Sequence, residues 1–137
     1  MKIRNFIFIM VLLVVASCTK SYMEKSASAI KLGSSNSYKN MTVDELNHQL
    51  KNKDFALVDV HIPEQKHING TDAFIPYDDI ENQLDKFPSD KNAKIVLYCR
   101  TGHMSQIAAE KLAQRGYTNV YNVVGGIVEW NSKGHGK

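Results

Sequence analysis

The stretch KIVLYCRTGHMS, residues Lys94 to Ser105, decides the fold of this chain. Its apolar run from Ile95 to Tyr98 predicts a strand buried on both faces, as in a parallel sheet. Cys99 follows at once, then a short polar loop, and then Ser105, which is predicted to cap a helix. This order sets the sulfur above a ring of backbone N–H groups at a helix N-terminus, where negative charge is favoured. We therefore expect a thiolate on Cys99 and the functional site in this loop.

Two capping patterns predict helix starts before this stretch. Thr42 and Glu45 form a capping box that opens a short helix ending near Asn52. Asp78 with Glu81 predicts a second helix start of the same kind.

The helix after the cysteine loop has the clearest amphipathic pattern in the chain. We expect it to end near Arg115, because Gly116 is a suitable residue to follow a helix. The residues predicted to face the core are Ala108, Ala109, Leu112 and Ala113.

Apolar runs alternate with these helices. Residues 55–60, 73–76 and 120–124 predict three more strands, and residues 127–132 predict a last short helix that buries Trp130. This alternation predicts a single α/β domain whose parallel sheet carries helices on both faces. Asp59 is a carboxylate near the end of the first run, so we interpret it as an acceptor that orients loop backbone or pairs with a basic residue.

Residues 1–17 are typical of a secretory signal peptide, because Lys2 and Arg4 precede an apolar run of 11 residues that is too short to span a membrane. The sequence VASC, ending at Cys18, resembles the lipobox of bacterial lipoproteins. This resemblance implies cleavage before Cys18, acylation of its sulfur, and a lipid anchor in the cell envelope that faces the periplasm or the exterior. Residues 18–40 are then the acylated cysteine and a flexible tether, and residues 41–135 the domain. The alternatives are an ordinary signal peptide with a chance cysteine and, less favoured, a cytoplasmic protein whose first strand is apolar.

Charge and cysteine usage restrict the function. Without residues 1–17, the chain has 15 Lys and Arg against 14 Asp and Glu, so its net charge gives no support to nucleic-acid binding. Once Cys18 is lipidated, Cys99 is the only thiol left, and an intramolecular disulfide is excluded. The five His show no metal-ligand spacing, so we expect no metal and no cofactor. His135, near the C-terminal end, is predicted to be mobile.

Four motifs in this order resemble the rhodanese family of sulfurtransferases. They are LVDV from Leu57, HING from His67, YCRTG from Tyr98 and GGIVEW from Gly125, and the resemblance covers roughly residues 40–135. It implies a single rhodanese-like domain that carries a sulfane sulfur as a persulfide on Cys99, the catalytic residue. The implied donor is thiosulfate or a persulfide on a partner protein, and the sulfur passes to a thiophilic acceptor.

The same resemblance implies that the loop cradles the persulfide with its backbone amides, with Asp59 in a supporting role. The implied substrate-binding residues are Arg100, Thr101, Gly102, His103, Met104 and Ser105. The chemistry agrees, because a terminal anionic sulfur needs convergent N–H donors. Gly102 permits the backbone curl that such a loop requires.

Three positions depart from the family pattern. Met104 stands where many active members carry a second Arg that holds the anionic donor, so Arg100 and His103 supply the positive charge here. A less charged donor, or a persulfide on a partner protein, then suits this pocket better than thiosulfate. His61 replaces a frequent Arg, and Asn69 replaces a usual Pro.

Two other functions stay open at this point. A phosphatase or arsenate reductase of related fold carries an Arg six residues after the Cys; that position is Ser105 here, so the clamp for a tetrahedral oxyanion is missing. A non-catalytic binding or thiol-sensing module at the cell envelope is favoured by the missing Arg and disfavoured by Cys99 itself. A thioredoxin-type redox partner is disfavoured because the chain has no Cys-x-x-Cys.

Overall fold

The structure is a computed structural model that describes residues 37–137. The predicted signal peptide (residues 1–17), the predicted acylation site Cys18 and residues 19–36 of the predicted tether lie outside the described residues. Among the described residues, no helix has both the length and the apolar character that crossing a bilayer requires.

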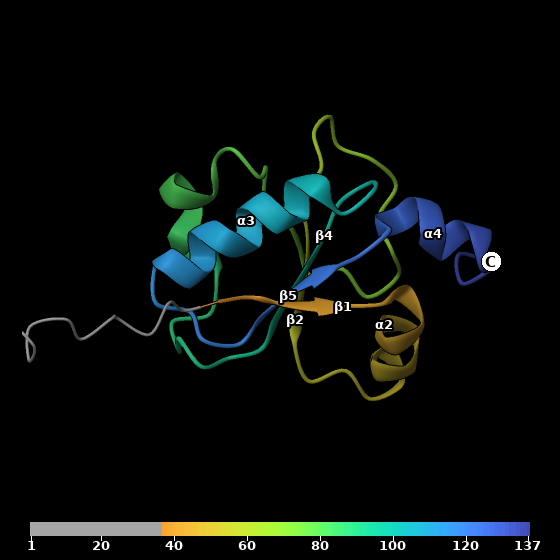
Figure 1. Cartoon of the computed structure of the whole chain (residues 1–137), viewed down its shortest axis with the longest axis horizontal. Helices are drawn as coiled ribbons and strands as arrows, with labels where there is room; N and C mark the ends of the chain where they lie inside the picture. Colours follow the sequence, from red (N-terminus) through yellow and green to blue (C-terminus); the bar gives the residue numbers. More distant parts are fainter. Residues whose placement is uncertain (1–36) are drawn as a thin grey trace, which may run out of the picture. The chain divides into compact units, whose positions relative to one another are not determined.

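Residues 37–137 contain one parallel five-stranded sheet in the order β1-β5-β4-β2-β3 (Figure 1). The predicted parallel sheet is confirmed. The strand of the deciding stretch, β4, is central, and Asp59 at the end of β2 is the register partner of Tyr98 at the end of β4. The strands are β1 (Lys39–Met41), β2 (Ala56–Asp59), β3 (Ala73–Phe74), β4 (Ile95–Tyr98) and β5 (Val120–Val123). Because all strands run the same way, the loops after β2, β4 and β5 meet at one edge of the sheet.

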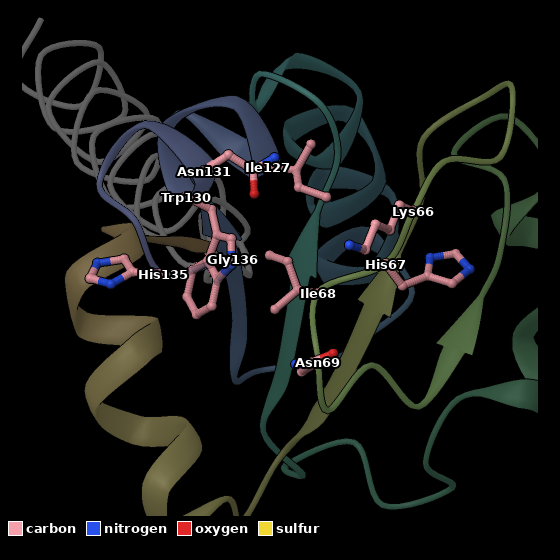
Figure 2. Close-up of a pocket in the computed structure, with 9 residues that line it drawn as sticks. All are labelled: Lys66, His67, Ile68, Asn69, Ile127, Trp130, Asn131, His135 and Gly136. Carbon is pink, nitrogen blue, oxygen red and sulfur yellow. The ribbon is translucent and has the colours of Figure 1, made fainter.

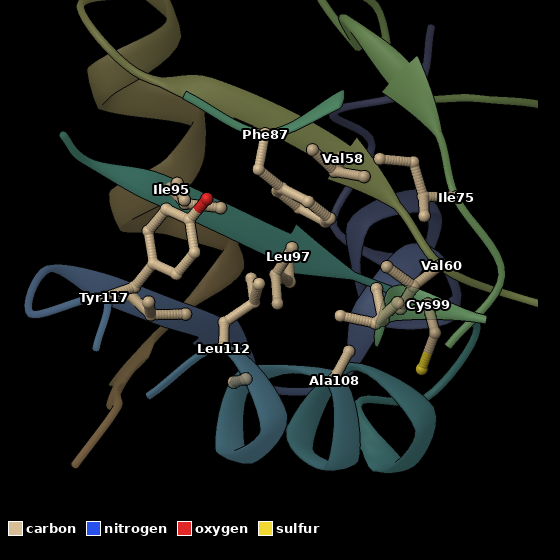
Figure 3. Close-up of a cluster of buried hydrophobic side chains, with 13 residues drawn as sticks. Val58, Val60, Ile75, Phe87, Ile95, Leu97, Cys99, Ala108, Leu112 and Tyr117 are labelled. Atoms are coloured by element: carbon tan, nitrogen blue, oxygen red, sulfur yellow. The ribbon is translucent and has the colours of Figure 1, made fainter. Parts of the chain in front are cut away.

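Helices cover both faces of this sheet, as the sequence predicted (Figure 1). One face packs against α3 and η2, and Figure 3 shows its apolar cluster, which includes Leu97, Cys99 and Leu112. The other face packs against α2 and α4 around Tyr98 and Trp130, so the prediction of Trp130 as a core residue is confirmed. The helical elements are α2 (Val43–Gln49), the 3-10 turns η1 (Leu50–Asn52) and η2 (Ile80–Lys86), α3 (His103–Gln114) and α4 (Gly126–Ser132).

The first strand, β1, lies where the sequence predicts the end of the tether, up to Asn40. It pairs with β5, with Lys39 opposite Tyr121 and Met41 opposite Val123. Two of its three residues, Lys39 and Asn40, are exposed and only Met41 is buried, so the sequence carries no apolar alternation there. A short strand at the sheet edge is selected by its partner rather than by its own composition.

The two predicted helix starts have different outcomes. The capping box at Thr42 is confirmed: its hydroxyl accepts from the Glu45 N–H at 3.2 Å, and the Glu45 carboxylate accepts from the Thr42 N–H at 2.7 Å. The cap predicted at Asp78 is wrong. The N-cap position of η2 is Asp79, whose carboxylate accepts from the side-chain amides of Asn82 and Gln83 instead of a backbone N–H. The element is accordingly a kinked 3-10 segment rather than an α-helix.

The helix after the cysteine loop ends as predicted. Arg115 is the C-cap of α3, and Gly116 follows with φ +90°. The N–H of Gly116 donates to the Ala113 carbonyl and that of Tyr117 to the Leu112 carbonyl, the pattern of a Schellman motif.

The C-terminal segment is ordered, and the prediction of a mobile His135 is wrong. The ring of His135 lies 5.0 Å from that of Trp130, and its Nε2 lies 2.8 Å from Asp44 Oδ1 on α2. The His135 N–H also donates to the Trp130 carbonyl. One contact with the distant Asp44 and two with Trp130 therefore fix a segment whose own Gly-rich sequence indicated freedom.

Candidate functional site

The Cys99 side chain points to the α3 face of the sheet. Side chains alternate along β4, so Leu97 and Cys99 share one face while Val96 and Tyr98 share the other. Figure 3 shows the sulfur at the end of the apolar cluster, near the first turn of α3. The residue is only 1% exposed, and its Sγ accepts from the Gly102 N–H at 3.1 Å.

The backbone amides of the loop lie around this sulfur with few other partners. The first helical bond of α3 runs from the Gln106 N–H to the Gly102 carbonyl, so the amides of the preceding helical residues have no helical acceptor. Within residues 37–137, five loop amides have no hydrogen-bond partner: those of Arg100, Thr101, His103, Met104 and Ser105. Together with the Gly102 amide, they make an anion-binding arrangement at the positive end of α3.

The start of α4 sets the direction of two of these amides. The Ile127 N–H donates to the Cys99 carbonyl at 3.0 Å, and the Val128 N–H donates to the Arg100 carbonyl at 3.1 Å. In a trans peptide the N–H points opposite to the carbonyl, so the Arg100 and Thr101 amides point away from α4. That side of the loop is the one on which Sγ lies, because α4 covers the opposite face of the sheet.

A glycine makes this close approach of α4 possible. A Cβ at Gly126 would lie 2.4 Å from the Cys99 carbonyl oxygen and 2.6 Å from the Arg100 carbonyl oxygen, both closer than van der Waals contact allows. Gly102 curls the loop with φ +100°. The glycines of two motifs, far apart in sequence, therefore shape one loop.

The side chains of the loop divide into an exposed rim and a buried base. Arg100, Thr101 and His103 are exposed, whereas Met104 is half-buried against the α3-side cluster. Ser105 is fully buried and does not cap the helix; that prediction is wrong. Gly102 occupies the N-cap position, and Ser105 is the third residue of α3, because the loop is tight enough for the helix to begin at His103.

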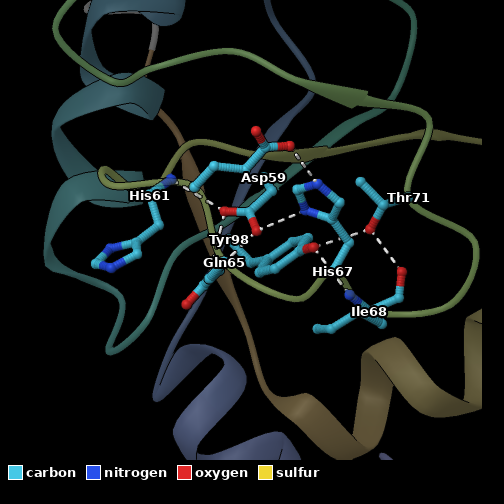
Figure 4. Close-up of polar contacts among 8 residues, drawn as sticks. Asp59, His61, Gln65, His67, Ile68, Thr71 and Tyr98 are labelled. Atoms are coloured by element: carbon cyan, nitrogen blue, oxygen red, sulfur yellow. Dashed lines mark hydrogen bonds and ion pairs between the residues drawn. The ribbon is translucent and has the colours of Figure 1, made fainter.

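Asp59 organises the loop after β2 rather than the cysteine loop. It is fully buried, and its carboxylate accepts from the His61 N–H at 2.9 Å and pairs with His67 Nδ1 at 3.0 Å (Figure 4). The Gln65 side chain donates to the same carboxylate. Because Asp59 alternates with Val58 along β2, it points to the face opposite Cys99. The structure therefore agrees with the interpretation of Asp59 as an acceptor that orients loop backbone and pairs with a basic residue.

His67 links two carboxylates in this loop. Its Nδ1 faces Asp59, and its Nε2 lies 3.0 Å from Glu64 Oε1. Burial by itself lowers the pKa of His67, but the hydrogen bonds to Asp59 and Glu64 outweigh burial, and the pKa is raised above its usual value. Nearby, burial raises the pKa of Tyr98, whose phenol oxygen accepts from the Ile68 N–H. The loop is thus tied to both β2 and β4.

A cavity of about 150 Å³ lies on this same face, between the loop after β2 and α4. Figure 2 shows Lys66 on one side of it and Trp130 on the other. Its apolar lining, Ile68, Ile127 and Trp130, belongs to the cluster on the α2 and α4 face. The Cys99 side chain points to the other face, so this cavity does not hold the sulfur.

Sequence analysis missed two polar residues of the site. His67 was recognised only as part of a motif, without its bond to Asp59. Asn122 was included in an apolar strand, although it is buried and accepts from the Ser105 hydroxyl at 2.7 Å. A polar residue within an apolar run was the available signal, and it was used for Asp59 but not for Asn122.

The family of the chain follows from comparison with known proteins. The model of the rhodanese-like domain matches residues 42–133. The chain belongs to the rhodanese-like domain family. A crystal structure of a rhodanese-like domain protein from Staphylococcus aureus is 32% identical, covers 67% of this chain and 90% of that chain, and has a TM-score of 0.60.

Curated relatives carry several names. The thiosulfate sulfurtransferase PspE of Escherichia coli is 35% identical over 71 residues, 50% of this chain and 67% of that protein. The adenylyltransferase and sulfurtransferase UBA4 of Candida albicans is 37% identical over 52% of this chain. The tRNA uridine(34) hydroxylase of Erwinia tasmaniensis is 40% identical over 41% of this chain. The chain spans only 16% and 17% of the length of these last two proteins.

Proposed function

We propose that this chain is a sulfurtransferase that carries a sulfane sulfur as a persulfide on Cys99. The observation that supports this most strongly is the arrangement of the Gly102 amide, 3.1 Å from Sγ, beside five loop amides without another partner among residues 37–137. An anionic outer sulfur needs such donors, and a structural cysteine does not. The sulfurtransferases among the relatives support the same reaction.

The proposed reaction has two displacement steps. The Cys99 thiolate attacks the sulfane sulfur of the donor, a new S–S bond forms, and the old bond breaks with its electron pair leaving on sulfite, from thiosulfate, or on a thiolate, from a persulfide. An acceptor thiolate then attacks the outer sulfur, and the Cys99 thiolate leaves with its electron pair. Sulfur enters and leaves with no net change at Cys99.

The loop side chains suggest which donor fits. Arg100 is exposed and forms no ion pair within the described residues, so it can meet a negative charge at the rim. Met104 contributes an apolar side chain where a second cation would hold a dianion. We therefore propose a persulfide, on a small molecule or a protein, as the better donor, with the backbone of residues 100–105 lining the pocket.

Mass measurement of the intact protein tests this proposal. The purified full chain is incubated with thiosulfate or with a small-molecule persulfide, and the gain of one sulfur atom is recorded. We expect loading of the wild-type chain and of Cys18→Ser, and none of Cys99→Ser. Transfer from the loaded chain to cyanide or a thiol completes the test. A wild-type chain that gains no sulfur from any donor contradicts the proposal.

A thiol-sensing or binding module is the second candidate, favoured by the low exposure of Cys99, 1%. A sensor needs the same amides but does not turn over. The two candidates separate at the second step: a sulfurtransferase releases its outer sulfur to an acceptor in repeated cycles, whereas a sensor holds it.

We also propose that the chain is anchored to the cell envelope by a lipid on Cys18, facing the periplasm or the exterior. The support is the sequence of residues 1–18 alone. Cells that express the chain are grown with labelled palmitate; label on wild type and none on Cys18→Ser is expected. Equal labelling of both would refute the anchor.

A further inference from the structure

Two buried polar side chains lie beneath the Cys99 sulfur in a core that is otherwise apolar. Ser105 is fully buried and Asn122 is 4% exposed. The helix neighbours of Ser105 that face the same core are Ala108 and Ala109. An alanine at position 105 would fill nearly the same space, favour the helix and avoid the cost of burying a hydroxyl. Packing therefore gives no reason for a serine here.

The Ser105 hydroxyl has one hydrogen and three acceptors within reach. Its Oγ lies 2.7 Å from Asn122 Oδ1, 3.2 Å from the Gly102 carbonyl oxygen and 3.5 Å from Cys99 Sγ. A single hydroxyl hydrogen serves one of these acceptors well at a time. Against a neutral thiol, the short bond to Asn122 wins. Against a thiolate, the charge-assisted bond to sulfur is roughly twice as strong as a neutral one and competes with it.

The orientation of Asn122 keeps this choice available. Its Nδ2 donates to Asn40 Oδ1 at 3.2 Å, so its Oδ1 faces Ser105. Asn40 on the edge strand β1 is the register partner of Asn122 on β5. This pairing sets the orientation of the Asn122 side-chain amide. Asn122 thus presents its carbonyl oxygen, an acceptor, to the Ser105 hydroxyl.

We infer that Ser105 is a positioning residue whose hydroxyl moves between Asn122 and the Cys99 sulfur, so that it donates to the sulfur only when the sulfur is negatively charged. The Cys99 thiolate starts the proposed reaction and is its leaving group in the second step. In both steps the thiolate accepts a hydrogen bond from Ser105 that the neutral thiol does not accept. The role in turnover rests on the proposed sulfur transfer. The hydrogen bond itself does not.

Other charged groups surround the site and stay constant in the test. Arg100 lies on the loop and His103 on the first turn of α3, while Asp59 ends the neighbouring strand β2, facing the other side of the sheet, and His61 lies in the loop after it. On α4, the Glu129 carboxylate lies against Gly125. None of these is altered by a change at Ser105 or Asn122, so a difference between variants reports the hydroxyl.

The alkylation rate of Cys99 with iodoacetamide tests the inference, in the full chain carrying Cys18→Ser so that one thiol is present. In mildly acidic buffer, Ser105→Ala should react about tenfold more slowly than its parent, the loss of one hydrogen bond to a charged group. In alkaline buffer, where all of the thiol is ionised, both should react alike. Ser105→Thr, which keeps the hydroxyl, should restore most of the acidic rate.

Asn122→Ala gives the opposite prediction. It removes the acceptor that competes with the sulfur, so the acidic rate should equal or exceed that of the parent. Ser132→Ala is the matched control, because that hydroxyl bonds only within α4 and is exposed. The inference is overturned if Ser105→Ala keeps the parent's dependence on pH, or if Asn122→Ala slows alkylation as Ser105→Ala does.

Failure of the proposed function would look different. A wild-type chain that takes up no sulfur refutes transfer but leaves the alkylation comparison intact. A chain that loads sulfur normally, with Ser105→Ala identical to its parent in alkylation, refutes only the role of Ser105. Circular dichroism of each variant checks that it folds.

Discussion

The loops that follow β4 and β2 lie at the same edge of one sheet, yet one is held mainly by backbone groups and the other mainly by side chains. The Cys99 loop is made by backbone: amides at the start of α3, two carbonyls held by α4, and glycines that allow the close approach. The Asp59 loop is made by side chains: a buried carboxylate, His67 and Gln65. The two also face opposite sides of the sheet.

This difference has a consequence for charge. Backbone donors at a helix start keep their partial charge at every pH and through most side-chain substitutions. The loop can therefore hold its amides in place even though Met104 stands where many family members carry an Arg. A loop fixed by a buried carboxylate and a histidine depends on both being present and charged. We expect the first loop to be sensitive to backbone changes and the second to charge changes.

The largest effect is expected where a side chain enters the backbone-made loop. Gly126→Ala places a Cβ 2.4 Å from the Cys99 carbonyl oxygen at a residue with φ +55°, so the loop must move. We expect sulfur loading to fall more than about tenfold and the free energy of unfolding to fall by about 3 kcal/mol. Intact-protein mass and urea denaturation measure the two effects.

Gly134→Ala is the control for that change. Gly134 has φ +78° but no heavy atom within 4 Å of an added Cβ, so the cost is backbone strain alone, about 1 kcal/mol. Loading should stay normal. If Gly126→Ala loads sulfur like wild type, α4 does not hold the loop.

The next effect should appear in the side-chain loop, and in stability rather than in loading. Asp59→Ala leaves His67, Gln65 and the His61 amide without their common acceptor. We expect a loss of about 2 kcal/mol in urea denaturation, less than for a fully buried pair because His67 is partly exposed. Sulfur loading should change less than twofold.

Asp85→Ala, at an exposed residue, should stay within about 0.5 kcal/mol of wild type. A collapse of sulfur loading in folded Asp59→Ala would mean that the two loops are coupled and do not act independently.

A smaller effect is expected from restoring a cation to the rim. Met104→Arg should raise kcat/KM for thiosulfate about tenfold, because a guanidinium at this position adds a permanent cation beside Arg100 to bind the dianion. The rate with an alkyl persulfide, which carries at most one negative charge, should change much less. Met104→Leu keeps the apolar volume and should match wild type with both donors. Equal rates of Met104→Arg and wild type with thiosulfate would show that charge at this position does not select the donor.

The smallest effect is a dependence of stability on pH through His67. The pKa of His67 is higher in the folded chain than in the unfolded chain, where it is about 6.5. The folded state therefore binds the proton more tightly, and protonation of His67 stabilises the fold. This contribution is complete below the unfolded pKa and is lost as pH rises through the folded pKa. Urea midpoints across that range should fall for wild type and stay flatter for His67→Gln. Parallel curves for the two proteins would contradict the role of the histidine.

Much of this architecture was readable from local patterns. The buried strand before Cys99, the amphipathic helix after it and the capping box at Thr42 were all predicted, because each depends on residues close in sequence. The order of these elements predicted a parallel sheet with helices on both faces. Errors fell where a partner far along the chain decides: β1 exists because it pairs with β5, and His135 is ordered because its ring contacts Asp44 on α2.

The site divides in the same way. The sequence by itself determined the position of Cys99, the loop that follows it and the family resemblance, since a strand, a cysteine, a glycine and a helix start in this order are a local arrangement. Only the tertiary structure decided that α4 turns two carbonyls away from the sulfur, that Asp59 serves the opposite face, and that Ser105 lies beneath Cys99 with Asn122. The physical reason is directional: hydrogen bonds depend on where groups point, and that is set by packing between segments distant in sequence.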